Sequence, residues 1–327
     1  MNRAGDSPDS SKAPAPRAAP LIGDADLRET QDISARLRLS RAGWIVGQGH
    51  HRSGWPYAIR CLAPLLADDG VLFDDFVERS FCYSPMRRPY DQPWIGIFHH
   101  PPRMPGGGYA RLRPQAIFNT DLCRASRPHL KLAISLSHYL AEFLRAELGV
   151  PTAVVTHPME TPELCFGEGR YRANADKRVV QVGSFLRNPR AIDALRSPSG
   201  FSKAVLGGQG SHGVERIARL NDKQYDRLLA ENVVFLQLLD ASASNTVIEC
   251  VVRNTPLVVN RHPAVEEYVG ADYPLFYDDL EQAGELLTVE RILAGHRHLA
   301  SLDKRRYAGE HFCRSIAGAV RSAIGHR

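Results

Sequence analysis

The sequence predicts an α/β protein made of two Rossmann-like domains that face each other across a cleft, followed by a terminal helix. Short apolar runs alternate with helical patterns, first from Gly43 onward and again from residue 178. Such alternation is typical of parallel sheets with crossover helices. A polar stretch rich in turn-forming residues separates the two series. The length of 327 residues also suits two domains of ordinary size.

The first half is predicted to start with a disordered leader and arm over residues 1–40, in which residues 24–40 form either a short helix or a solvated arm. An N-terminal Rossmann-like domain follows over residues 41–160. Its predicted strands are 43–47, 94–98, 131–137 and 152–158. Its predicted helices are 55–67 and 138–148, the second of them closed by the stop signals Gly149 and Pro151.

The second half repeats this alternation of strands and helices after a linker at residues 161–177, and the second Rossmann-like domain spans residues 178–290. A helix is predicted at 246–254. The predicted strands are 178–185, 202–208, 232–239, 255–260 and 273–279. Residues 291–327 continue as a basic helical tail with an apolar residue at every fourth position, namely Phe312, Ile316, Val320 and Ile324.

Composition excludes several broad classes of protein. Hydrophobic residues make up 43% of the chain and charged residues 24%, so the chain can bury a substantial core and is neither wholly disordered nor fibrous. The formal net charge is +5, but residues 291–327 hold eight Lys and Arg against two Asp and Glu, which leaves −1 for everything before them. This distribution does not indicate a nucleic-acid binder, and it suits an anionic small ligand.

The cysteines indicate a reducing environment. All six are widely scattered and form no CxxC pair, so we expect free thiols and no zinc site. The N-terminus has no apolar core for a signal peptide, and no stretch approaches the ~18 apolar residues of a membrane span. We therefore expect a cytoplasmic protein without a bound metal or cofactor.

Two loops that follow predicted strands of the first half carry polar residues. The loop 47–54 contains glycines with basic and polar side chains, which fit either a phosphate contact or a plain tight turn; the candidates are Gly49, His50, His51 and Ser53. It is neither a Walker A loop nor a GxGxxG fingerprint. His99 and His100 end a strand and could act as a base or bind a sugar hydroxyl. Alternatively, one histidine packs in the core and the other is solvated.

Two loops of the second half could hold a diphosphate. Gly183, Arg187 and Arg190 follow its first strand, and the arginines could neutralise a leaving group or simply lie on the surface. A second loop opens the helix near residue 246, where Ser244, Asn245 and Thr246 would offer backbone N–H groups to an anion. Glu249 lies one turn further and could accept hydrogen bonds from a ribose, or be an ordinary surface residue at the start of a capped helix.

The segment T-V-I-E-C-V-V-R-N-T-P-L-V-V (246–259) resembles the donor-site helix of retaining GT-B glycosyltransferases of the large family-four group. By this resemblance Glu249 matches the ribose-binding glutamate, and Asn245 and Thr246 match residues whose amides hold the diphosphate. His99 resembles the histidine beside the transferred sugar. The resemblance also implies that the basic tail packs back on the N-terminal, acceptor-side domain, although its arginines could instead contact an anionic membrane surface.

The sequence departs from the family pattern at three positions. Ala241 stands where the family has the first glutamate of a pair, with Asp240 adjacent. Asn254 replaces a glycine, and Ser184 replaces an arginine.

The resemblance implies that the protein transfers a sugar from a nucleoside diphosphate sugar to an unidentified acceptor. That acceptor could be a glycan, a lipid-linked molecule, a natural product or a protein. A retaining, metal-independent reaction is expected, because helix N-termini and arginines can offset the diphosphate charge. Two alternatives stay open: a nucleotide-sugar epimerase using the pair Glu266 and Glu267, and a catalytically inert GT-B-like binding protein.

Overall fold

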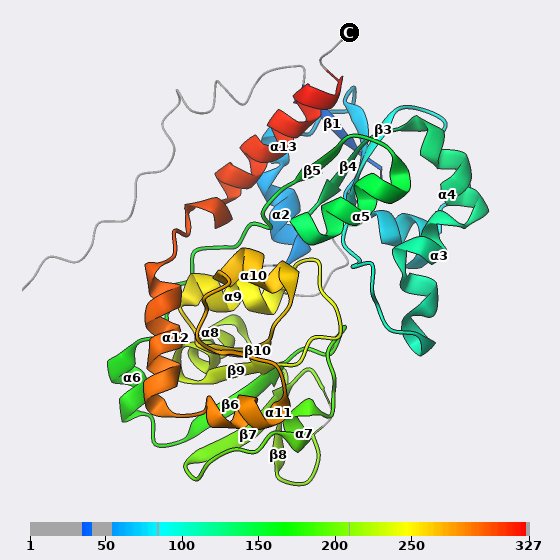
Figure 1. Cartoon of the computed structure of the whole chain (residues 1–327). Helices are drawn as coiled ribbons and strands as arrows, with labels where there is room; N and C mark the ends of the chain where they lie inside the picture. The colour runs from blue at the N-terminus through cyan, green and yellow to red at the C-terminus, as the bar shows by residue number, and fades with distance from the viewer. Residues whose placement is uncertain (1–34, 41–53, 84, 209, 325–327) are drawn as a thin grey trace, which may run out of the picture.

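The computed structural model describes residues 35–40, 54–83, 85–208 and 210–324. Within them the chain forms two parallel sheets, each covered by helices (Figure 1). The predicted fold class is therefore confirmed. Residues 1–34 of the predicted leader and arm, the strand predicted at 43–47 and the loop candidates Gly49, His50, His51 and Ser53 lie outside the described residues. The prediction of a helix or a solvated arm is wrong for residues 35–40, which contain a strand at Leu37–Leu39 with Leu37 fully buried.

The N-terminal sheet has five strands in the spatial order β1-β2-β3-β4-β5. All neighbouring pairs are parallel, so each connection must cross over one face of the sheet. The strands are β1 (Leu37–Leu39), β2 (Val71–Asp74), β3 (Trp94–Phe98), β4 (Leu130–Ser135) and β5 (Thr152–Val154). The sequence analysis missed β1 and β2.

Helices cover both faces of this sheet. Alternate side chains of β3 pack against the helices on opposite faces. Ile95 and Ile97 join a core cluster with α2 and α13, while Trp94 and Phe98 join a second cluster with α3, α4 and α5. Successive strand residues point to opposite faces, which explains why β3 is apolar throughout. The helices are α2 (Trp55–Cys61), α3 (Pro114–Phe118), α4 (Asp121–Ser126), α5 (His138–Leu148) and α13 (Gly309–Ile324).

The C-terminal sheet has six parallel strands in the order β11-β10-β9-β6-β7-β8. This is the doubly wound order, in which the order of the strands reverses between β6 and β9 and ligands bind at the carboxyl ends of those strands. The strands are β6 (Lys177–Val182), β7 (Phe201–Leu206), β8 (Val214–Ile217), β9 (Val233–Leu236), β10 (Leu257–Asn260) and β11 (Phe276–Tyr277). The sequence analysis missed β8.

The remaining helices surround this second sheet and extend into the tail. They are α6 (Glu168–Ala173), α7 (Ala191–Ala194), α8 (Asp222–Glu231), α9 (Asn245–Arg253), α10 (Pro263–Val269), α11 (Leu280–Glu285) and α12 (Val289–Ser301). Short turns of 3-10 or π type are η3 (Ala63–Leu65), η4 (Arg79–Tyr83), η5 (Gly107–Leu112), η6 (Arg127–His129) and η7 (Arg305–Tyr307). Among the described helices, none combines the length and the apolar character needed to cross a bilayer.

The tail is divided into separate helices. After α12 the chain leaves the second sheet, turns through η7, and α13 runs back along the N-terminal sheet beside α2 (Figure 1). Phe312, Ile316 and Val320 are fully buried in the same core cluster as Ile95 and Phe73. The apolar stripe of the tail thus completes one face of the N-terminal sheet. The bounds predicted for the two domains and the linker remain predictions.

Candidate functional site

Two adjoining cavities open at the carboxyl ends of the strands. The interdomain cavity, of about 770 Å³, is lined by residues of both halves, among them His99, Arg187 and Ser244. The C-domain cavity, of about 1440 Å³, lies beyond the ends of β6, β7 and β8, and Arg190 and Glu249 line it. The loop after β6 and helix α9 contribute residues to both cavities, the start of α9 to the interdomain cavity and Glu249 and Arg253 to the C-domain cavity, as expected at the reversal point of a doubly wound sheet.

Arg187 lies at the N-terminus of α9. Its Nη2 donates to Thr246 Oγ1 at 2.9 Å and to Ser244 Oγ at 3.4 Å, and its Nη1 donates to the Phe185 carbonyl at 3.1 Å. Its Nε is buried and has no hydrogen-bond partner among the described residues. Burial lowers the pKa of the Arg187 guanidinium, which still titrates far above neutrality and stays cationic.

The backbone of the β6 loop is shaped to admit this guanidinium. Gly183 has φ +77°, in the left-handed region that favours glycine, and a Cβ built there would lie 2.9 Å from Arg187 Nη1. Helix α9 offers its first N–H groups, which have no acceptor within the helix, on the same side. A cation and a helix N-terminus at one point form a site for an anionic group. The predicted residues Gly183, Arg187, Ser244, Asn245 and Thr246 are brought together here.

Glu249 lies one turn inside α9 and is only 2% exposed. Its side chain lines the C-domain cavity and accepts a hydrogen bond from the Tyr225 hydroxyl. Burial, with the Glu249 charge beside it, raises the pKa of Tyr225 well above its ordinary value, so the hydroxyl remains a donor. The interpretation of Glu249 as an ordinary surface residue is therefore wrong. Arg190 is exposed at the rim of the same cavity.

His99 and His100 are both held by the protein. Their backbone N–H groups each donate to Glu78 Oε1 at 2.7 Å. His99 Nε2 lies 3.0 Å from the Asp75 carbonyl, and burial lowers the pKa of His99. His100 Nδ1 lies 2.6 Å from the Leu112 carbonyl. Since a carbonyl only accepts, each of these ring nitrogens carries a proton.

His100 makes a second contact through its other ring nitrogen, because Tyr83 Oη lies 3.0 Å from His100 Nε2. Burial raises the pKa of Tyr83 to about 12, so the tyrosine keeps its proton and can donate it to His100. The alternative in which one histidine packs in the core and the other is solvated is wrong: both rings line the interdomain cavity, half-buried or buried.

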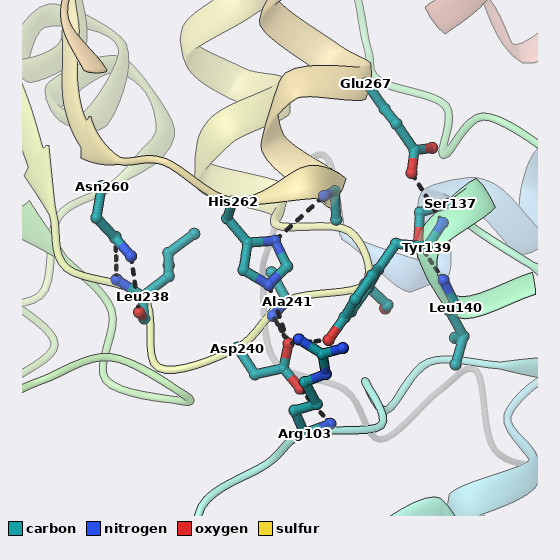
Figure 2. Close-up of polar contacts among 12 residues, drawn as sticks. Arg103, Ser137, Tyr139, Leu140, Leu238, Asp240, Ala241, Asn260, His262 and Glu267 are labelled. Carbon is teal, nitrogen blue, oxygen red and sulfur yellow. Dashed lines mark hydrogen bonds and ion pairs between the residues drawn. The ribbon is translucent and has the colours of Figure 1, made fainter. Parts of the chain in front are cut away.

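Asp240 joins the two halves, and the sequence analysis did not identify it as a site residue. Its carboxylate accepts from Arg103 N at 2.6 Å, Tyr139 Oη at 3.1 Å, His262 Nε2 at 3.0 Å and Ala241 N at 2.9 Å (Figure 2). His262 Nδ1 accepts from a backbone N–H of α10, so Nε2 is the protonated nitrogen. Asp240 is 2% exposed and lines the interdomain cavity.

Glu266 and Glu267 lie elsewhere. The Glu267 carboxylate accepts from the backbone N–H groups of His138 and Tyr139 at 2.7 and 2.9 Å and thereby caps α5 (Figure 2). Glu266 pairs with Arg261 at 2.6 Å. Both glutamates line a third cavity, of about 640 Å³, that includes none of the residues predicted for the donor site. The epimerase alternative loses its two acid–base groups, because neither glutamate lines the interdomain cavity.

No family model and no curated protein matches the sequence, but solved structures match the fold. A sucrose-phosphate synthase from Thermosynechococcus elongatus aligns with TM-score 0.53 and 11% identity over 78% of this chain and 69% of its own. An α,α-trehalose-phosphate synthase (UDP-forming) from Burkholderia vietnamiensis aligns with TM-score 0.53 and 12% identity over 83% and 76%. A trehalose-6-phosphate synthase aligns with TM-score 0.53 and 11% identity over 92% and 84%. The fold is GT-B.

Within this GT-B fold, the structure shows what surrounds each of the three departures from the family pattern. Asn254 ends α9 with φ +57°, a left-handed conformation that asparagine tolerates better than most residues, so it replaces the glycine without breaking the turn. Ala241 carries no carboxylate, and the neighbouring Asp240 is held by donors from both halves. Ser184 lines the C-domain cavity, while Arg187, three residues later, supplies a guanidinium beside α9.

Proposed function

We propose that this chain is a glycosyltransferase that moves a sugar from a nucleoside diphosphate sugar to a hydroxyl group of an acceptor. The observation that carries the proposal is the Arg187 guanidinium at the N-terminus of α9, between two cavities. The nucleoside would lie in the C-domain cavity with its ribose on Glu249, and the sugar would lie in the interdomain cavity. The solved neighbours support this reading, since their names describe sugar-phosphate synthases and one is called UDP-forming.

The proposed reaction forms a bond between the acceptor oxygen and the anomeric carbon and breaks the bond from that carbon to the diphosphate oxygen. The acceptor proton passes to the leaving diphosphate, which fits a retaining front-side reaction. Arg187 and the α9 N-terminus would stabilise the charge that develops on the leaving group, without a metal ion. His99 would hydrogen-bond the sugar from the opposite wall, while His100 holds Tyr83 in place.

The proposed setting is the cytoplasm, where the six free cysteines stay reduced. Contact with an anionic membrane surface is a further part of the proposal. Because the apolar stripe of α13 is buried in the protein, such contact would depend on exposed basic side chains such as Arg314 and would weaken with salt.

The first test is a thermal-shift panel of UDP, GDP, dTDP, ADP and CMP. A nucleotide at ~100 times its Kd adds about 2.7 kcal/mol of stability, so we expect one nucleotide to raise the unfolding midpoint of the wild type. Glu249→Gln, which keeps an oxygen for Tyr225, and Arg187→Ala should lose most of this increase. Glu147→Ala, an exposed change on α5, is the control and should behave as wild type. A flat panel with the wild type would contradict the proposal.

A second candidate is an inert GT-B-like binding protein, favoured by Ala241 and by the engagement of Asp240 in the interface. It predicts nucleotide binding with no turnover. Incubation of the matching nucleotide sugar with an acceptor library, followed by mass spectrometry of the products, separates the two. Release of the nucleoside diphosphate together with a glycosylated product supports the transferase, whereas nucleotide binding without either product supports the inert protein.

A further inference from the structure

Two exposed aromatic side chains of the described residues line the interdomain cavity. Over the described residues, three large hydrophobic side chains are exposed: Tyr83 at 45%, Phe185 at 44% and Leu239 at 44%. Tyr83 and Phe185 line the interdomain cavity from opposite halves. The backbone of Leu239 pairs with the segment that carries Phe185, since its N–H donates to the Leu186 carbonyl at 2.9 Å. Exposed apolar groups collected at one cavity indicate a ligand surface.

Aromatic rings continue from this rim into the cavity. The His100 ring lies between Tyr83 and Phe185, with ring centres 5.5 and 5.7 Å away. Phe76 lies 6.2 Å from Tyr83 and 4.3 Å from His99, and Trp55 lies 4.4 Å from His99. The wall opposite the proposed diphosphate site is therefore a continuous row of rings, which offers faces and edges for stacking.

The polar atoms of this wall are largely engaged within the protein. Trp55 Nε1 donates to Asp75 at 2.7 Å, Tyr83 Oη donates to His100, and His100 also holds the Leu112 carbonyl. His157 Nδ1 holds the Pro158 carbonyl at 2.7 Å. A carbohydrate acceptor needs many donors and acceptors for its hydroxyl groups, and a wall with its polar groups already paired serves such a molecule poorly.

The described residues on this side of the cavity include few cationic groups. Apart from histidines, Arg79 is the one basic side chain of the described N-domain residues that line the cavity. Its guanidinium is buried and lies over the Phe76 ring, 5.1 Å from the ring centre. Recognition of a phosphorylated acceptor relies on charge-assisted contacts with several donors. Arg187 belongs to the opposite half, where we propose that it binds the diphosphate of the donor.

We propose that the acceptor is an uncharged molecule with an aromatic ring and a hydroxyl group, whose ring stacks on Tyr83 and Phe185. This inference rests on the proposed function and specifies its acceptor. The ring occupies the apolar rim while the hydroxyl enters the cavity toward the donor sugar.

The test uses 4-methylumbelliferone, a fluorescent phenol, as the probe. Fluorescence titration should show binding to the wild type, and Tyr83→Ala and Phe185→Ala should each weaken the Kd by about fivefold. Phe185→Leu keeps an apolar side chain but removes the ring, so it is less prone to a folding defect than Phe185→Ala. It should also weaken binding of the phenol. Phe143→Leu changes an aromatic residue at the third cavity and serves as the matched control with an unchanged Kd. Thermal unfolding checks that each variant is folded.

Competition distinguishes the acceptor classes. We expect neither glucose nor glucose 6-phosphate to displace the phenol at concentrations where the phenol itself saturates. Two results would overturn the inference. One is displacement of the phenol by either sugar at a concentration lower than that of the phenol. The other is a Kd for the phenol that stays the same in Tyr83→Ala and Phe185→Ala. The nucleotide panel is read separately: nucleotide binding without phenol binding defeats only this inference, whereas phenol binding without any nucleotide binding defeats the proposed transferase.

Discussion

A buried carboxyl group lies at the end of β2 in the N-terminal half. Asp74 is almost fully enclosed; its Oδ2 accepts from Tyr90 Oη at 2.9 Å and its Oδ1 accepts from Phe76 N at 3.2 Å. Burial raises the pKa of Asp74 from 3.8 to about 6. The folded protein therefore holds this proton more tightly than the unfolded chain does.

Stability should consequently depend on pH through Asp74. Between about pH 4 and 6 the unfolded chain loses the Asp74 proton while the folded protein keeps it, so the free energy of unfolding falls as pH rises, by up to about 3 kcal/mol in total. Urea unfolding of wild type and Asp74→Asn across this range isolates the effect, because other groups cancel in the difference. The advantage of wild type over the variant should shrink toward pH 6; a difference that stays constant with pH would contradict the raised pKa.

At the same scale, the sequence predicted those candidate site residues that are neighbours along the chain. Ser244, Thr246 and Glu249 could be predicted because strand, loop and helix follow one another and leave the helix N-terminus at the strand end. Asp240 could not, since its partners Arg103 and Tyr139 lie more than 100 residues away. Only the packing of one half on the other brings these donors to the carboxylate.

At the scale of elements, strong local signals fixed the bounds best. Helix α5 runs over His138–Leu148 as predicted, since Ser137 accepts from Leu140 N at its start and Gly149 takes φ +65° at its end. Strand β2 was missed because its four residues are flanked by acidic and turn-forming residues that hide a short apolar run. Strand β8 was missed because it is short, and polar side chains break its pattern at the sheet edge.

Helix α13 should be a major source of stability. Ile316 is fully buried against the N-terminal sheet, so Ile316→Ala removes apolar contacts and leaves a cavity, at a cost of about 2–5 kcal/mol. Arg314→Ala, on the exposed side of the same helix, should change the free energy of unfolding by less than about 0.5 kcal/mol. Urea unfolding measures the free energy of unfolding of both variants. Equal losses in Ile316→Ala and Arg314→Ala would show that the apolar stripe of α13 does not stabilise the fold by packing.

At the scale of the whole molecule, the two halves are joined by hydrogen bonds that reach across from each side. Asp240 holds Arg103 and Tyr139, Glu267 caps α5, and Tyr268 Oη donates to the Leu136 carbonyl at 2.6 Å. Ser242 Oγ also donates to the His99 carbonyl at 2.5 Å. These contacts surround the interdomain cavity, so they fix the separation of its two walls.

Removing one contact should loosen the interface locally. In Asp240→Ala the Arg103 N–H loses its acceptor, so amide hydrogen exchange at Arg103 and Met104 should become faster while β3 stays protected. Asp91→Ala, an exposed change in the same half, is the control and should leave both unchanged. Slow exchange at Arg103 in Asp240→Ala would mean that this carboxylate does not hold the interface.

The path of α13 has a consequence for synthesis of the protein. The N-terminal sheet leaves the ribosome first, yet the helix that covers one of its faces is made after the whole second sheet. Until then Ile95, Phe73 and their neighbours lack part of their cover, and nascent chains with such uncovered apolar surface are prone to aggregate. We therefore expect the first half to need protection by chaperones during translation and to reach its native packing only after the second half has folded.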